Sequence, residues 1–165
     1  MRRSFLRILP VLFLLVCGGL IQAVMGATDE YLIVPGKSVG AIEIGKPIPN
    51  GVMQTLGKPT NYTKPEPGKN GRDTGNYYWE GKLNVKINDG RGDFNVFQIL
   101  LSNPKYHTKN GIRVGTAVGD VKKAYPSGKR IEWIDCDFAW AATGITFCIN
   151  GGKVVAISVL PAGAK

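Results

Sequence analysis

The sequence has few of the side chains on which enzymes most often depend. Its single histidine is His107, so any Ser/His/Asp or Cys/His mechanism would require that one residue. His107 lies in a polar stretch without a nucleophile motif, and no glycine-rich loop leads into a helix with Lys-Ser or Lys-Thr at its start. The composition therefore predicts neither catalytic residues nor a cofactor or metal.

Cysteine is also scarce, with three in 165 residues, and Cys17 falls in the leader described below. We expect Cys136 and Cys148 to form a disulfide if the protein reaches an oxidising compartment. The alternative, a metal site at this pair, would need at least one more soft ligand, and no histidine is near in sequence.

The N-terminal segment contains no acidic residue. Three arginines within the first seven residues precede an apolar run at 8–21, and small residues follow up to Ala27. This order is typical of a signal peptide, which we expect to span 1–27 and to direct the protein to the periplasm or outside the cell. Three alternatives stay open: an uncleaved anchor, a twin-arginine rather than a general secretory address, and lipid attachment at Cys17. After cleavage we expect no transmembrane segment.

Acidic residues are fewer than basic ones. Loss of the leader removes three of the 21 basic residues and none of the 12 acidic ones, which leaves a formal net charge of +6. Such a surface favours anionic envelope partners, such as lipopolysaccharide, anionic lipid or an acidic protein, although the scattered charges also fit a plain solvated surface. Export disfavours nucleic acid as a partner.

The mature chain contains two copies of one pattern. In the first copy, a short apolar segment ending in glycine at 42–45 precedes a two-turn helix at 52–56. The second copy has the same order at 112–115 and 121–125, with one residue fewer between them. The sequence therefore predicts two units, at 28–104 and 105–165.

Capping residues set the predicted ends of these helices. Gly57 can take a positive φ at the end of the first helix, and Pro59 prevents its continuation. Thr116 is expected to cap the second helix, Asp120 lies in its first turn and Pro126 ends it. Helices this short require packing against a sheet.

A β-hairpin follows each helix. Apolar and polar residues alternate before Asp89-Gly90 and before Asn150-Gly151, dipeptides that favour tight turns. The predicted strands are 83–88, 94–102, 145–149 and 153–160, with an additional aromatic strand ahead of each hairpin at 76–80 and 130–140. The stretches 60–75 and 105–110 are expected to be a loop and a connector.

This duplicated order of glycine-flanked strand, short helix and antiparallel meander resembles the beta-lactamase inhibitor protein fold. The single unit is similar to the SmpA/OmlA outer-membrane assembly lipoproteins. The resemblance extends from Tyr31 to Leu160 and rests on architecture and glycine spacing, so no family binding residue is carried over. It implies an α+β fold with one curved antiparallel sheet, helices on one face and an open face that binds protein.

Aromatic residues concentrate in the additional strand of each unit, where they could anchor a partner protein or fill the core. Alternation along 130–140 separates the residues expected to be exposed from Ile134 and Cys136. The candidate binding residues are Trp133, Asp135, Asp137, Tyr77 and Trp79.

Together these features predict an exported, non-enzymatic module of the bacterial envelope that binds a protein through an open sheet face. Two alternatives remain. One is a small periplasmic enzyme, or an inhibitor of a cell-wall or antibiotic hydrolase. The other is a component of outer-membrane assembly.

Overall fold

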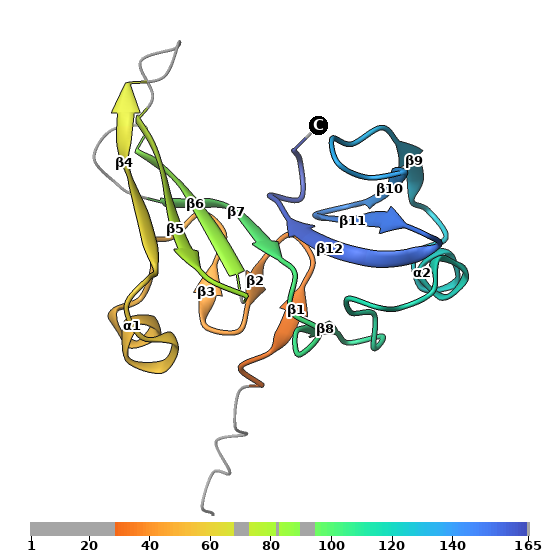
Figure 1. Cartoon of the computed structure of the whole chain (residues 1–165), viewed down its shortest axis with the longest axis horizontal. Helices are drawn as coiled ribbons and strands as arrows, with labels where there is room; N and C mark the ends of the chain where they lie inside the picture. Colours follow the sequence, from red (N-terminus) through yellow and green to blue (C-terminus); the bar gives the residue numbers. More distant parts are fainter. Residues whose placement is uncertain (1–28, 68–72, 82, 90–94, 165) are drawn as a thin grey trace, which may run out of the picture.

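The computed structural model describes residues 29–67, 73–81, 83–89 and 95–164. The predicted leader at 1–27 and the turn residue Gly90 lie outside the described residues. Within the described part the protein has an α+β fold of two sheets and two short helices (Figure 1). The predicted α+β class is confirmed, whereas the prediction of a single sheet is wrong, because residues 32–43 and 107–108 form a second sheet with one parallel strand pair.

The larger sheet is antiparallel throughout, with the strand order β4-β5-β6-β7-β12-β11-β10-β9. Its first half consists of β4 (Asn61–Pro67), β5 (Asp73–Trp79), β6 (Leu83–Asp89) and β7 (Asn95–Leu101). Its second half consists of β9 (Lys129–Ile131), β10 (Phe138–Ala142), β11 (Ile145–Asn150) and β12 (Lys153–Val159). The halves join where β7 pairs with β12, from Leu101 opposite Ile157 to Ile99 opposite Val159.

The smaller sheet has the strand order β3-β2-β1-β8. Its strands are β1 (Leu32–Val34), β2 (Ser38–Val39), β3 (Ile42–Glu43) and β8 (His107–Thr108). β1 and β8 run parallel, so the beginning of the described chain lies beside the stretch that connects the two halves of the large sheet. The predicted connector at 105–110 therefore contributes a strand.

The two helices are α1 (Asn50–Leu56) and α2 (Val118–Ala124). Each helix has seven residues and buries one valine, Val52 in α1 and Val121 in α2. Gly57 follows α1 with a φ of 79°, as predicted. The prediction for α2 is wrong in one respect: its N-cap is Ala117, without a side-chain bond, because the Thr116 hydroxyl instead accepts a hydrogen bond from the Arg113 N–H. Among the described residues no helix has the length and apolar character needed to cross a membrane.

One face of the large sheet, here called the inner face, contains the core. Val85, Phe147 and Ile157 on this face are fully buried and belong to one apolar cluster with Val52 of α1 and Val121 of α2. Both helices and the small sheet therefore cover the inner face. The opposite face is called the outer face below.

Equivalent backbone hydrogen bonds connect each helix-leading segment to the large sheet. Gly45 donates to the Val96 carbonyl at 2.7 Å, and the Val96 N–H donates to the carbonyl of the residue after that glycine at 2.9 Å. In the second half, Gly115 donates to Val154 at 2.8 Å, and Val154 donates to the residue after Gly115 at 2.9 Å. The hairpin β6–β7 contains a register shift directly before the pair Ile87–Val96. The hairpin β11–β12 contains one directly before the pair Ile149–Val154.

A tryptophan indole satisfies a carbonyl at the end of each helix. The Trp79 Nε1–H donates to the Gly57 carbonyl at 2.9 Å, and the Trp140 Nε1–H donates to the Tyr125 carbonyl at 3.0 Å. Carbonyls at helix C-termini have no partner within the helix, so each indole bond stabilises the seating of its helix on the sheet.

The hairpin between β11 and β12 lies where it was predicted, but its turn is shifted by one residue. Gly151 and Gly152, rather than Asn150 and Gly151, form the two-residue turn, with φ values of 55° and 75°. A turn that needs positive φ at both central positions strongly favours glycine there.

Two predicted elements are wrong. The stretch 130–140 is not one strand, because β9 ends at Ile131 and β10 begins at Phe138, with a loop at 132–137 between them. The predicted loop at 60–75 contains β4 and the beginning of β5. β4 tolerates two prolines because it is an edge strand, whose outward N–H groups need no partner.

Replacing Trp79 with Phe should lower the free energy of unfolding by about 1 to 2 kcal/mol, because the part-buried hydrogen bond to the Gly57 carbonyl and part of the core packing of the indole are lost. Trp140→Phe is the matched change in the other half and should have a smaller effect, since Trp140 is only half-buried. Urea unfolding followed by circular dichroism measures both. An unchanged midpoint for Trp79→Phe would contradict the role of this bond.

Candidate functional site

The outer face has a row of residues that crosses the sheet from strand to strand. Cross-strand pairing aligns Tyr78 with Asn84, Asn84 with Leu100, Leu100 with Ser158, Ser158 with Thr146, and Thr146 with Ala141. The residues in the second half of the row are small, and their neighbours Ala139 and Ala156 on the same face are small too. Small side chains leave a hollow on the sheet surface.

The loop at 132–137 forms one wall of this hollow. Figure 1 shows it as a wide arch between β9 and β10. A pocket of about 240 Å³ lies between the loop and the outer face. Its lining residues are Leu100, Trp133, Ile134, Asp135, Cys136, Thr146, Cys148, Val155, Ala156 and Ser158.

A disulfide fastens the loop to the sheet. Cys136 in the loop is bonded to Cys148 on β11, and the two Cα atoms are 5.7 Å apart. The predicted disulfide is therefore present. Cys148 faces outward on β11 together with Thr146, so a loop that crosses the outer face is what allows Cys136 to reach it.

Hydrogen bonds to the β11–β12 turn hold the same loop a second time. The Asn150 side chain accepts from the Asp137 N–H at 2.6 Å and donates to the Asp135 carbonyl at 3.1 Å. The Asp137 carboxylate in turn accepts from the Gly151 N–H at 2.8 Å. The loop is thus held by one covalent bond and three hydrogen bonds that involve side chains.

Asp135 has a φ of 66°, the one positive value found among the described residues other than glycine. Most L-residues avoid this region, and Asp and Asn tolerate it best. A residue keeps such a conformation when its surroundings over-determine it, as the disulfide and the Asn150 bonds do here.

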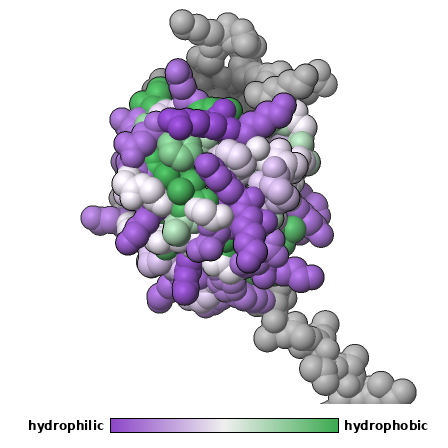
Figure 2. Space-filling model, turned by 90° about the vertical axis from the view of Figure 1, so that its right-hand side faces the viewer, coloured by the Kyte–Doolittle hydropathy of each residue, from purple (hydrophilic) through white to green (hydrophobic). Residues whose placement is uncertain are grey.

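The rigid loop exposes Ile134. Its side chain is 83% exposed, about twice the value for any other large apolar residue that the structure describes. An isoleucine kept in water on a doubly fastened loop has no role in the core of this chain. Figure 2 shows apolar side chains exposed among polar ones on the side of the molecule that carries β9 and β10.

The predicted binding residues do not form one surface. Trp133 and Asp135 line the outer pocket, whereas Asp137 holds the loop through Gly151. Tyr77 is half-buried on the inner face, where its ring stacks on Trp79. Trp79 is 1% exposed, so its assignment as a contact residue is corrected: it is a core residue, because its indole fills the space under α1.

Sequence reasoning missed Ile134. Alternation along a continuous strand placed it with the apolar residues that face the core, and the loop invalidates that reasoning. One signal was present in the sequence. Alternation placed Cys136 and Cys148 on opposite faces of the sheet, and a disulfide between them is possible only if one of the two cysteines leaves its strand.

The segment 131–152 differs in charge from the rest of the protein. It contains Glu132, Asp135 and Asp137 but no lysine or arginine, although the whole chain has a formal net charge of +9. The loop at 132–137 is therefore acidic, while Lys129 of β9 pairs with Ala141 and lies on the same outer face. A partner at this site is favoured if it is basic.

His107 has no catalytic surroundings. Its Nε2 lies 3.1 Å from the Asp29 carboxylate, and its Nδ1 lies 3.1 Å from the Lys105 carbonyl. No side-chain nucleophile belongs to this arrangement. The described residues also contain no group of three or more His, Cys, Asp or Glu side chains placed to hold a metal ion.

A second pocket, of about 310 Å³, lies between α1 and the small sheet. Val52 and Leu56 of α1 line one side, and Tyr31 and Tyr106 line the other. Burial is the main reason why the pKa of Tyr106 is raised to about 12, so its hydroxyl keeps its proton at physiological pH.

Comparison of the chain with protein-family models, curated proteins and solved structures gives no match.

Removing the disulfide with the double change Cys136→Ser and Cys148→Ser should lower the free energy of unfolding by about 2 to 3 kcal/mol, since the bond closes a short chain loop. Urea unfolding in the absence of reductant measures the difference. Adding reductant should bring the native protein to the stability of the double variant and leave the variant unchanged. Equal stability of the two oxidised proteins would contradict a structural role.

Proposed function

We propose that this protein is an exported, non-enzymatic binding module that holds a partner protein against the outer face of its large sheet, with the loop at 132–137 as the main contact. The observation that carries the proposal is the exposure of Ile134, at 83%, on a loop held by a disulfide and by Asn150. A few anchor residues supply most of the binding free energy at protein interfaces, and an apolar side chain on a preorganised loop is suited to that role.

The rigidity of the loop supports binding rather than mere exposure. Association costs free energy when interface loops become ordered, and a loop that is already held in place avoids that cost. Trp133 precedes Ile134 in the same loop and lines the pocket beside it. Two adjacent large apolar side chains beside a pocket give a compact contact surface.

Export and duplication belong to the same proposal. Disulfides persist in oxidising compartments, and the pair Cys136–Cys148 agrees with the signal peptide expected at 1–27. Support for two copies of one unit comes from the matching hydrogen bonds of Gly45 with Val96 and of Gly115 with Val154. We extend the proposed likeness to the beta-lactamase inhibitor protein fold on that basis.

One alternative has an observation in its favour. A rigid loop that presents one apolar side chain is suited to entering the cleft of an enzyme, which fits an inhibitor of a cell-wall or antibiotic hydrolase. In that case the partner protein is an enzyme and the contact residues stay the same. An outer-membrane assembly component would instead bind members of a barrel-assembly complex.

Ile134→Ser is the decisive change. It should weaken binding of the partner by about 30-fold, because an apolar anchor at an interface contributes about 2 kcal/mol. The free energy of unfolding should change by less than about 0.5 kcal/mol, because the side chain has no role in the core. Partners are captured from an envelope extract with the native protein, purified, and measured by calorimetry against both forms.

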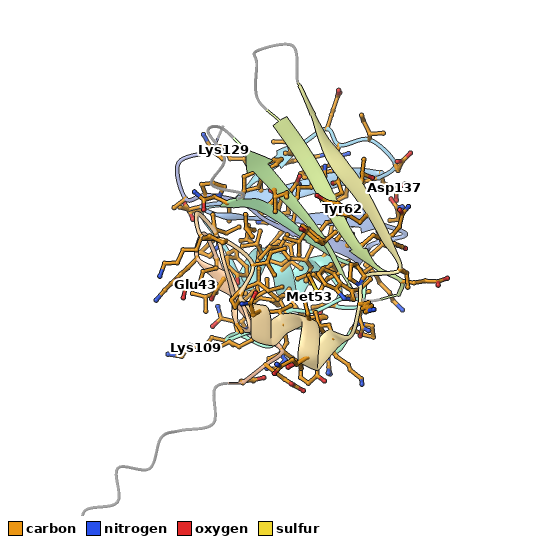
Figure 3. The ribbon with its side chains drawn as sticks, turned by 90° about the vertical axis from the view of Figure 1, so that its left-hand side faces the viewer. Glu43, Met53, Tyr62, Lys109, Lys129 and Asp137 are labelled. Carbon is orange, nitrogen blue, oxygen red and sulfur yellow. A yellow bond between two sulfur atoms is a disulfide. The ribbon has the colours of Figure 1, made fainter. Side chains whose placement is uncertain are left out.

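Tyr62→Ser is the matched control, since Tyr62 is 40% exposed but lies on β4 at the far edge of the sheet (Figure 3). It should leave the affinity unchanged. Equal affinity of Ile134→Ser and the native protein would remove the loop from the binding surface. Turnover of peptidoglycan by the purified protein alone would overturn the non-enzymatic assignment.

A further inference from the structure

The floor of the outer pocket is polar although it is deeply buried. Thr146 is 6% exposed and Ser158 is 2% exposed, and both line the pocket. The Ser158 hydroxyl accepts a hydrogen bond from the Gln98 side chain at 2.8 Å. The Thr146 hydroxyl has no hydrogen-bond partner within the described part of the chain. Thr146 Oγ1 is not among the fully buried side-chain atoms that lack a partner, so this hydroxyl is open to the pocket, where a ligand atom can form a hydrogen bond with it.

A second unsatisfied acceptor lies in the same cross-strand row. The side-chain oxygen Oδ1 of Asn84 is buried without a hydrogen-bond donor among the described residues. Asn84 pairs with Leu100, which lines the pocket. Asn84 itself does not line the pocket, so Thr146 and Ser158 supply the polar atoms of the pocket floor.

The walls of the pocket are apolar, and its edge is acidic. Leu100, Val155 and Trp133 supply the apolar walls, and Asp135 supplies a carboxylate. The segment 131–152 contains three acidic residues and no basic one, and Lys129, which faces outward on β9 opposite Ala141, does not line the pocket. An extended apolar stem that ends in a cationic hydrogen-bond donor matches all of these features.

We infer that the outer pocket is a specificity pocket for a lysine or arginine side chain of the partner protein. The aliphatic stem lies between Leu100 and Trp133, and the cationic head donates hydrogen bonds to the Thr146 hydroxyl and to the Asp135 carboxylate. The inference rests on the proposed function, because it names the chemistry of the partner that meets the 132–137 loop. An anionic ligand is disfavoured by Asp135, and a purely apolar one would leave Thr146 without a partner.

The inference is tested by NMR titration of the ¹⁵N-labelled protein with N-acetyl-arginine methylamide and N-acetyl-lysine methylamide. The amides of Thr146 and Ser158 and the Trp133 indole should shift in a saturable manner. N-acetyl-norleucine methylamide has a similar stem without charge, and N-acetyl-glutamate methylamide has the opposite charge. Both should bind at least about fivefold more weakly or not at all.

Two variants assign the contacts. Asp135→Asn keeps a residue that tolerates positive φ, and it should weaken the binding of the cationic probes by about threefold to fivefold. Thr146→Val keeps the shape of the side chain, and it should weaken the binding of the same probes by about fivefold. Asp120→Asn is the matched control, because Asp120 is exposed in the first turn of α2 and does not line the pocket. It should leave both affinities unchanged.

Equal binding of the norleucine and arginine probes, or no saturable shift with any probe, would overturn the assignment of the outer pocket as a lysine or arginine site. Either result leaves the proposed function standing if partner affinity still depends on Ile134. Conversely, if the arginine probe binds but no partner depends on Ile134, the pocket is supported and the binding loop is rejected.

Discussion

The antiparallel pairing of β7 with β12 joins two four-stranded meanders into one sheet. It aligns Leu101 with Ile157 on the inner face and Leu100 with Ser158 on the outer face. On the inner side this makes one continuous apolar layer, which neither half could bury with a single short helix of seven residues. On the outer side it places Leu100 of the first half next to Ser158 of the second, so the candidate site includes residues of both halves.

The candidate site depends on how one loop is fastened. With one bond alone the 132–137 loop could rotate about that attachment. The disulfide at Cys136 and the hydrogen bonds of the Asn150 side chain to residues 135 and 137 fix the loop at neighbouring points. Ile134 and Trp133 are therefore held in one arrangement before a partner arrives. Under the proposed function, a partner protein would meet a loop that is already ordered, so binding would not carry the free-energy cost of ordering it.

Much of the fold could be predicted from the sequence, because local chemistry determines it. Gly57 ends α1, and two glycines make the turn between β11 and β12. β4 was missed because its prolines and lysines have a loop-like composition, and an edge strand tolerates them. The candidate site was predicted only in part, since alternation cannot reveal that a chain leaves its sheet between Ile131 and Phe138. Depth in the fold decides whether an aromatic contacts a partner, and no local pattern shows that Trp79 lies under α1.

The two outermost strands of the large sheet have a consequence for the behaviour of the protein in a crowded compartment. An exposed sheet edge is a template on which further chains can polymerise. β4 contains Pro65 and Pro67, which lack amide protons, and β9 has only three residues, two of them the cations Lys129 and Arg130. β4 and β9 thus each have features that oppose edge-to-edge pairing with further chains.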